Sequence, residues 1–270
     1  MIYPICVQCG VQFSESEAPP PACAVCEDSR NYVNWRGQRW TTMEALGRDH
    51  RSLLRAVEPG LTGLSTVPEF AIGQRALLVE TPEGNVLWDC VSLVDDEAVR
   101  AVRQRGGLAA IAVSHPHFYG SVVEWSRAFG GAPVYLHASD REWVMRPDPC
   151  IVHWEGDRLD LPGGITAVRC GGHFAGGTVL HWPAGASGLG VLLTGDIVHV
   201  VHDRRYVSFM YSFPNLIPLR ADAVRAIEEA LRPFEFERIY GAWWERDILA
   251  GARDALSRSA ARYIAAVAGP

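Results

Sequence analysis

The segment Ser114-His115-Pro116-His117-Phe118-Tyr119-Gly120-Ser121 follows an apolar run, residues 107–113, whose length and flanking glycines predict a buried strand. Residues 120–129 are expected to form a helix with one apolar side. Two histidines spaced i and i+2 therefore lie on a strand-to-helix loop, where an extended step can direct both imidazoles at one centre. An imidazole pair suits a transition metal; the alternative is two histidines hydrogen-bonded to loop carbonyls.

Further candidate ligands follow other expected strands. His173 comes after residues 165–170, and Asp196 comes after residues 190–194. Loops at strand ends are where a sheet scaffold gathers reactive side chains. Three imidazoles and one carboxylate complete a site able to hold zinc or iron. The sequence therefore predicts a metal site made of His115, His117, His173 and Asp196.

The seven cysteines of the chain fall into two classes. Cys6 and Cys9 form one C-x-x-C pair, and Cys23 and Cys26 form another after thirteen intervening residues. Paired C-x-x-C motifs indicate a structural site of four thiolates that usually holds zinc. Redox dithiols and an iron centre of rubredoxin type are the alternatives. The other cysteines stand singly in apolar surroundings and are expected to be small buried hydrophobic residues: Cys90, Cys150 and Cys170.

The chain is expected to divide into two units. Residues 1–40 would form a small zinc ribbon with its linker, and residues 41–270 the main domain. The ribbon contains a loop rich in Ser, Glu and Pro, residues 14–21, which cannot build a core and depends on the metal for its fold. Nucleic-acid ribbons are generally basic, whereas this one is acidic. We therefore expect it to pack on its own chain or on a protein partner.

The main domain shows alternating strand and helix signals. A helix is expected over residues 42–55, a β-hairpin over residues 75–88, and a helix from Asp95 or Asp96 to Gly106. Strands are expected from residue 70 onward, and those after the hairpin and the 107–113 strand cover 133–136, 151–153, 158–161, 165–170, 178–182, 191–194 and 236–240. Later helices are expected at 139–145, 221–232 and 252–267. This alternation predicts an α+β fold in which helices sandwich two sheets.

Composition restricts the function. The 270 residues carry a formal net charge of −6, which disfavours binding to nucleic acid or to an anionic membrane surface. All 25 basic residues are arginines, which excludes lysine Schiff-base chemistry and a Walker-type phosphate loop. No apolar run is long enough to span a membrane, and the first residues lack the features of a signal peptide. We expect a cytoplasmic protein with a small-molecule substrate, and homo-oligomerisation stays open.

Over residues 66–250 the chain resembles the metallo-β-lactamase-fold superfamily. Four features match in order: Asp89 after the hairpin, the H-x-H loop of His115 and His117, Gly172-His173, and Gly195-Asp196. The resemblance implies an αβ/βα sandwich with metals at the ends of the sheets.

Three departures from the family pattern concern the second metal. The family motif H-x-H-x-D-H supplies that metal through its Asp and last His, whereas this chain has Tyr119 and Gly120 there. The family's final histidine ligand would fall near Ala242 or Trp243, and this chain has no histidine there. The set for the first metal is intact, and the usually bridging Asp196 is retained. The resemblance therefore implies a single metal ion at this site.

A single ion held by three neutral imidazoles supports hydrolysis of a small ester or thioester. Asp196 would be both ligand and base, with Tyr119, His199 or His202 as an assisting group. A surface or supporting role is the alternative for the two histidines. Aromatic residues are expected to line a narrow, apolar substrate pocket: Trp243, Trp244, Tyr206 and Tyr211.

Two other functions stay open. Persulfide dioxygenases of this fold hold one iron through two histidines and an aspartate, which here would be His115, His173 and Asp196. The third alternative is a non-catalytic binding or scaffold protein that keeps a remnant of the site. The metal content of the purified chain distinguishes the three.

Overall fold

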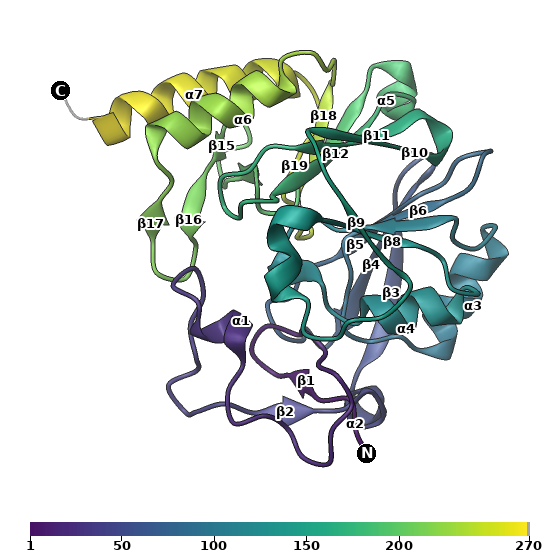
Figure 1. Ribbon diagram of the computed structural model, residues 1–270. Helices are drawn as coiled ribbons and strands as arrows, with labels where there is room; N and C mark the ends of the chain where they lie inside the picture. The colour runs from purple at the N-terminus through teal and green to yellow at the C-terminus, as the bar shows by residue number, and fades with distance from the viewer. Residues whose placement is uncertain (269–270) are drawn as a thin grey trace.

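Two β-sheets lie face to face in the computed structural model of the chain, and helices cover their outer faces (Figure 1). The structure describes residues 1–268. The first sheet runs in chain order through β3 (Arg51–Glu58), β4 (Leu61–Val67), β5 (Ala76–Val79), β6 (Val86–Trp88), β7 (Ala110–Ala112), β8 (Val134–His137) and β9 (Ile151–Trp154). Its strands are antiparallel as far as β6 and parallel from β6 to β9.

The second sheet comes from the later part of the chain. It runs through β10 (Arg158–Leu161), β11 (Ile165–Arg169), β12 (Thr178–Trp182), β13 (Val191–Leu193), β18 (Arg238–Tyr240) and β19 (Asp247–Ile248). Only the β13–β18 pair is parallel, and α6 (Ala221–Leu231) lies in the crossover that joins these two strands. Shorter elements complete the chain: η1 (Pro116–Phe118), η2 (Ala138–Trp143), η3 (Pro162–Gly164), α5 (Gly185–Gly188), β14 (His199–Val200) and β15 (Val207–Ser208).

The alternation of side chains along each strand creates three apolar layers. In β5, Leu77 and Val79 face the second sheet, whereas Ala76 and Leu78 pack against α3 (Asp96–Gln104) and α4 (Val122–Ala128). The second sheet turns its other face to α6 and α7 (Ala252–Ala268). The predicted α+β sandwich, an αβ/βα arrangement, is confirmed.

Two predicted helices differ in the structure. The expected helix over residues 42–55 ends early, because α2 covers only Met43–Asp49 and the chain continues into β3. β3 pairs with β4 across a turn at Gly60, and the first sheet therefore starts before residue 70. Pairing with a neighbouring strand is a non-local effect that overrides the local helical pattern. The expected helix at 139–145 is instead the 3₁₀ helix η2.

The N-terminal segment, residues 1–40, is called the ribbon below. It contains β1 (Ile5–Cys6) and α1 (Ala24–Glu27), and β1 pairs with β2 (Trp40–Thr41) where the segment ends. Figure 1 shows it at one end of the sandwich, where the hairpin of β16 (Met210–Ser212) and β17 (Ile217–Pro218) reaches down to it. The hairpin is called the β16–β17 hairpin below.

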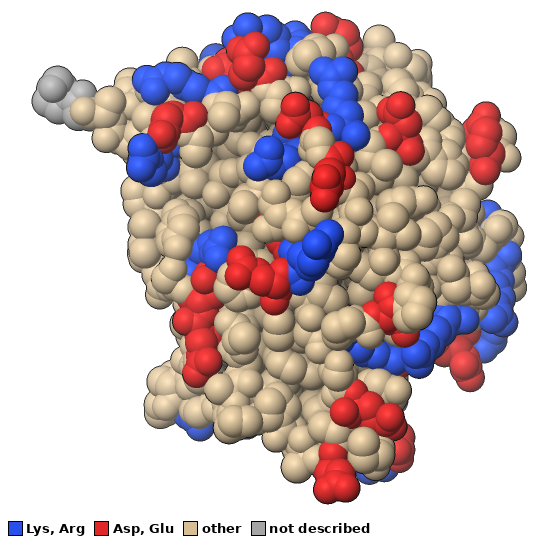
Figure 2. Space-filling view, in the orientation of Figure 1, with Lys and Arg blue, Asp and Glu red and all other residues tan. Residues whose placement is uncertain are grey.

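Figure 2 shows acidic and arginine side chains side by side over the face in view, in small groups of both signs. Among residues 1–268, none of the helices has the length and apolar character that crossing a membrane requires.

Candidate metal centres

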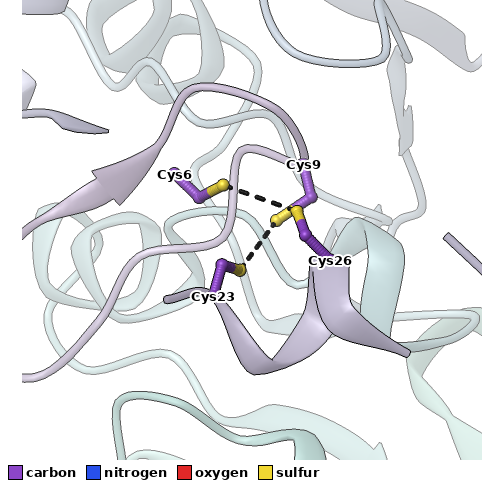
Figure 3. A group of neighbouring side chains, drawn as sticks. All are labelled: Cys6, Cys9, Cys23 and Cys26. Carbon is purple, nitrogen blue, oxygen red and sulfur yellow. Dashed lines mark hydrogen bonds between the residues drawn. The ribbon is translucent and has the colours of Figure 1, made fainter. Parts of the chain in front are cut away.

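The four cysteines of the ribbon point toward a common centre (Figure 3). The Sγ atoms of Cys6 and Cys26 are 3.6 Å apart, and those of Cys9 and Cys23 are 3.7 Å apart. A tetrahedral ion with metal–sulfur distances of about 2.3 Å places its ligands roughly 3.8 Å from one another, whereas a disulfide requires about 2.05 Å. All four side chains are buried. The group therefore has the dimensions of a four-thiolate metal site.

A second group of candidate ligands lies where strands of the two sheets end. His115 and His117 follow β7, His173 follows β11, and Asp196 follows β13. One ligand atom from each lies within 4.8 Å of the others, and all four side chains are buried. The structure thus brings together the four residues that the sequence singles out. This group is called the His₃Asp site below.

Hydrogen bonds fix which nitrogen of two histidines faces the centre. Ser114 Oγ donates to Asp89, so the contact of 2.9 Å between Ser114 Oγ and His115 Nδ1 has the imidazole as donor. His173 Nδ1 likewise donates to the carbonyl of Met210 at 3.2 Å. Both rings therefore carry their proton on Nδ1 and present a free Nε2 lone pair, the tautomer that a metal ligand needs.

Burial keeps these imidazoles neutral. Loss of hydration and the neighbouring His173 hold the pKa of His115 and His117 well below the ordinary value for histidine. Burial also lowers the pKa of His173. Neutral rings keep the lone pairs that bind a metal.

The spacing of the ligand atoms fits one ion. His173 Nε2 lies 3.2 Å from His117 Nδ1, and His115 Nε2 lies 3.8 Å from Asp196 Oδ2. Nitrogen and oxygen ligands of a tetrahedral zinc ion, bound at about 2.0–2.1 Å, lie roughly 3.3 Å apart. His115 Nε2 and Asp196 Oδ1 are buried without any hydrogen-bond partner, although buried polar atoms are normally satisfied. Both observations agree with a cation-binding site.

Residues that are not ligands support His115. Asp89 Oδ1 accepts hydrogen bonds from the Ser114 backbone N–H at 2.8 Å and from its hydroxyl at 2.7 Å. Burial raises the pKa of Asp89 to about 7, against the lowering effect of these two bonds. Gly195 lies so close that a Cβ there would be 2.4 Å from Ser114 Oγ. Asp89 and Gly195, which belong to the features matched to the resembled family, therefore shape the surroundings of His115.

A cavity of about 370 Å³ opens beside the His₃Asp site. His117, His173 and Asp196 line it on the metal side. Its other lining residues come from the ribbon, the loop after β4, the β16–β17 hairpin and the loop after β18: Gln8, Arg30, Asn31, Tyr32, Ala71, Ile72, Phe213, Pro214 and Trp243. The pocket is thus built from segments far apart in the sequence.

The aromatic residues predicted to line the pocket have different positions. Trp243 lines it, and its Nε1 donates to the carbonyl of Ile72. Tyr211 is not among the lining residues; its hydroxyl bonds to Ser29 of the ribbon, and its ring centre lies 5.9 Å from the Arg30 guanidinium. The prediction needs correction for Tyr211 and for the other two residues. Trp244 packs on Gly63 and donates to Ser65 of β4, and Tyr206 stacks under Arg262 of α7.

Tyr119 also lies away from the pocket, although the sequence makes it a candidate acid. Its side chain belongs to the apolar layer beside α4, and burial raises its pKa well above the ordinary value for tyrosine. The next residue, Gly120, carries a Cβ position only 3.2 Å from the carbonyl oxygen of Val91. Its own carbonyl accepts the N–H of Gln12 from the ribbon. The two positions that bear second-metal ligands in the resembled family are therefore used here for packing and ribbon docking.

His199 and His202 were the candidate assisting groups, and two further residues, Phe174 and Arg30, were not singled out from the sequence. His199 Nδ1 lies 3.7 Å from Asp196 Oδ1, whereas His202 is exposed and contacts Arg246. Phe174, directly after His173, packs its ring 4.9 to 5.5 Å from all three metal-site imidazoles. Arg30 stacks on Phe174. No sequence signal distinguishes Arg30 from the other two arginines of the ribbon, Arg36 and Arg39.

Comparisons with known proteins agree with the fold. No family model matches the chain. One similar solved structure is the DIM-1 metallo-β-lactamase exposed to ceftazidime, with a TM-score of 0.57 and 15% identity over 77% of this chain and 97% of that one. Another is TMB-1, with a TM-score of 0.61 and 12% identity over 81% of this chain and 99% of that one. The chain has the metallo-β-lactamase fold.

One known protein has a higher sequence identity to the chain than these two structures. The uncharacterized protein YmaE of Bacillus subtilis (strain 168) is 46% identical over 269 residues, which cover 99% of this chain and 97% of the relative. The chain belongs to the same family as YmaE.

Proposed function

We propose that the chain is a hydrolase that acts at a single metal ion on a small ester or thioester. The observation that carries this proposal is the convergence of three neutral imidazoles and Asp196 beside a cavity. The positions that would hold a second metal carry Tyr119, Gly120 and, beside the pocket, Trp243. None of these three residues provides an imidazole or a carboxylate for a second metal.

The residues of the site fit the chemistry of hydrolysis. A divalent metal on three neutral imidazoles lowers the pKa of a bound water to about 7 and polarises a carbonyl group. Asp196 Oδ2 faces His115, and Oδ1 has no hydrogen-bond partner and faces His199. We assign Asp196 Oδ1 as the proton acceptor for the attacking water and His199, whose Nδ1 lies 3.7 Å from Oδ1, as the assisting group.

The pocket supports a compact substrate with an apolar part. Trp243, Phe213 and Ile72 form apolar walls, and the volume of about 370 Å³ lies near the lower end of the range for small-molecule sites. The formal net charge of −6 supports a small molecule over nucleic acid or an anionic membrane as the partner.

A panel of thioesters, lactones and phosphoesters tests the proposal, with metal content measured on the same samples. His117→Ala removes one ligand, and we expect its turnover to fall by about 100-fold or more. The matched control is His202→Ala, an exposed histidine outside the site, which should keep the rate of the unaltered chain.

Each alternative gives a different result. Hydrolysis at the same rate in His117→Ala and in the unaltered chain would contradict the assignment. Iron at the site together with oxygen consumption would favour the dioxygenase. A chain that holds metal only in the ribbon, when purified without chelator, would favour a binding or scaffold protein.

A further inference from the structure

The ribbon forms one side of the pocket beside the His₃Asp site. Gln8, Arg30, Asn31 and Tyr32 line the cavity from the ribbon. Residues of the main domain, among them Phe213 and Trp243, line it from the opposite side. The pocket is therefore complete only when the ribbon is docked.

Arg30 connects the ribbon to a metal ligand. Its Nε and Nη2 atoms pair with Asp28 at 2.5 and 2.9 Å, which neutralises its charge and fixes its plane. The guanidinium lies 3.8 Å from the centre of the Phe174 ring, and Nη1 donates to the carbonyl of His173 at 3.4 Å. Because Asp28 already occupies one edge of the guanidinium, Arg30 is a connector between the ribbon and His173 and not a free anion site.

The β16–β17 hairpin holds the same ribbon segment and the same histidine. Ser212 Oγ donates to the carbonyl of Arg30 at 3.0 Å, and Asn215 Nδ2 donates to the carbonyl of Asn31 at 2.9 Å. The carbonyl of Met210, on the same hairpin, accepts a hydrogen bond from the ring Nδ1–H of His173. Residues 29–31 and His173 are thus fixed by one set of contacts. The four-cysteine cluster ends only four residues before Arg30, at Cys26.

We propose that the metal-loaded ribbon is a working part of the His₃Asp site. Arg30 is a positioning residue that holds His173 in its ligand geometry, and Tyr32 is a wall of the pocket that favours a substrate with a compact apolar group next to the metal. The statement about the substrate rests on the proposed hydrolase function. The statement about metal binding does not.

Cobalt loading of the full chain tests the role of Arg30. Cobalt bound to thiolates gives intense charge-transfer absorption, and cobalt bound to imidazoles and carboxylate gives only weak d–d bands, so the two sites are read separately. In Arg30→Ala we expect about tenfold weaker cobalt affinity at the His₃Asp site, measured against a competing chelator. The thiolate absorption should stay unchanged, which shows that the ribbon is intact.

Arg36→Ala is the matched control, because Arg36 lies in the same segment and stacks on the exposed ring of Trp35. It should leave both sites unchanged. Asn215→Ala is the second variant, for use if Arg30→Ala disturbs the ribbon. It removes the hydrogen bonds to the carbonyls of residues 29 and 31 from a residue outside the ribbon, and it should lower the cobalt affinity of the His₃Asp site several-fold. An affinity within twofold of the unaltered chain in a variant with an intact ribbon would overturn the role of Arg30.

Binding of benzyl mercaptan to the cobalt-loaded chain tests the wall, with 2-mercaptoethanol as a small polar comparison. Both thiols bind cobalt through sulfur, and only the first carries an apolar ring. We expect at least a fivefold preference for benzyl mercaptan, reduced to less than twofold in Tyr32→Ala and unchanged in the neighbouring control Val33→Ala. An unchanged preference in Tyr32→Ala would overturn the role of the wall. Both measurements need no turnover, so a failure of the hydrolase proposal would not affect their result.

Discussion

A series of close contacts that begins at Asp89 orients His115. Asp89 accepts hydrogen bonds from the backbone N–H and the hydroxyl of Ser114. The Ser114 hydroxyl oxygen in turn accepts a hydrogen bond from the Nδ1–H of His115. Gly195 closes this group from the other side and adopts a φ of 52°, in the left-handed region that favours glycine. The geometry of a ligand thus depends on residues that never touch the metal.

Gly195→Ala is expected to damage both stability and metal binding. The new Cβ would lie 2.4 Å from Ser114 Oγ, and the hydroxyl would have to leave its place beside His115. Left-handed strain of about 1–2 kcal/mol and overpacking of about 1–3 kcal/mol should together lower the free energy of unfolding by roughly 3 kcal/mol. Urea unfolding and titration of metal into the His₃Asp site measure the two effects.

Gly164→Ala separates strain from the clash, because Gly164 has a φ of 69° and open space around its Cβ position. This control should lose only about 1 kcal/mol and should bind metal normally. Equal losses in the two variants would show that the contact with Ser114 is unimportant.

The loop after β7 serves two purposes at the scale of elements. Its first part supplies His115 and His117, and its second part, Tyr119 and Gly120, docks the ribbon and packs against α4. In the resembled family the second part would carry metal ligands. The ribbon and a second metal therefore compete for the same positions of this loop.

The double variant Tyr119→Asp/Gly120→His restores the family motif, and we expect it not to restore a second metal. Position 120 has a φ of 48° and lies against the carbonyl of Val91, and position 119 is buried among apolar side chains. A buried carboxylate and a lost aromatic ring should lower the free energy of unfolding by more than about 3 kcal/mol. Metal analysis should still find two ions per chain, one in the ribbon and one in the His₃Asp site.

Tyr119→Phe serves as the control for this variant. It keeps the ring, so stability should change by less than about 1 kcal/mol and activity should be unaffected. Three tightly bound ions in the double variant would contradict the view that packing replaced the second site.

The parts of the site that follow strands could be predicted from the sequence, because each ligand is adjacent to a local signal. His115, His173 and Asp196 each come directly after an apolar run that ends in the sheet. Arg30 could not be found in this way, because its partner His173 is 143 residues away and no local pattern links them. β3 was missed for a related reason, since its strand conformation depends on pairing with β4.

The ribbon links both halves of the sandwich at the scale of the whole molecule (Figure 1). On the first half, Gln12 N–H donates to the carbonyl of Gly120 at 3.1 Å, and Ser92 Oγ donates to the carbonyl of Gly10 at 2.7 Å. On the second half, the β16–β17 hairpin holds residues 29–31. The ribbon itself has a small apolar cluster made largely of its cysteines. We therefore expect its fold, and with it the link between the halves, to depend on a bound metal.

Cys26→Ser is expected to lower the stability of the whole chain and not only that of the ribbon. Loss of one thiolate should reduce the metal content from two ions per chain to one at saturating metal, and the melting temperature should fall by about 10 °C, since structural metals contribute several kcal/mol to folding. Cys150→Ser replaces a single, half-buried cysteine of the main domain and should keep both ions and melt within about 3 °C of the unaltered chain. Metal analysis together with thermal melting followed by circular dichroism measures both variants. If Cys26→Ser loses its ion yet melts at the temperature of the unaltered chain, the ribbon does not hold the two halves together.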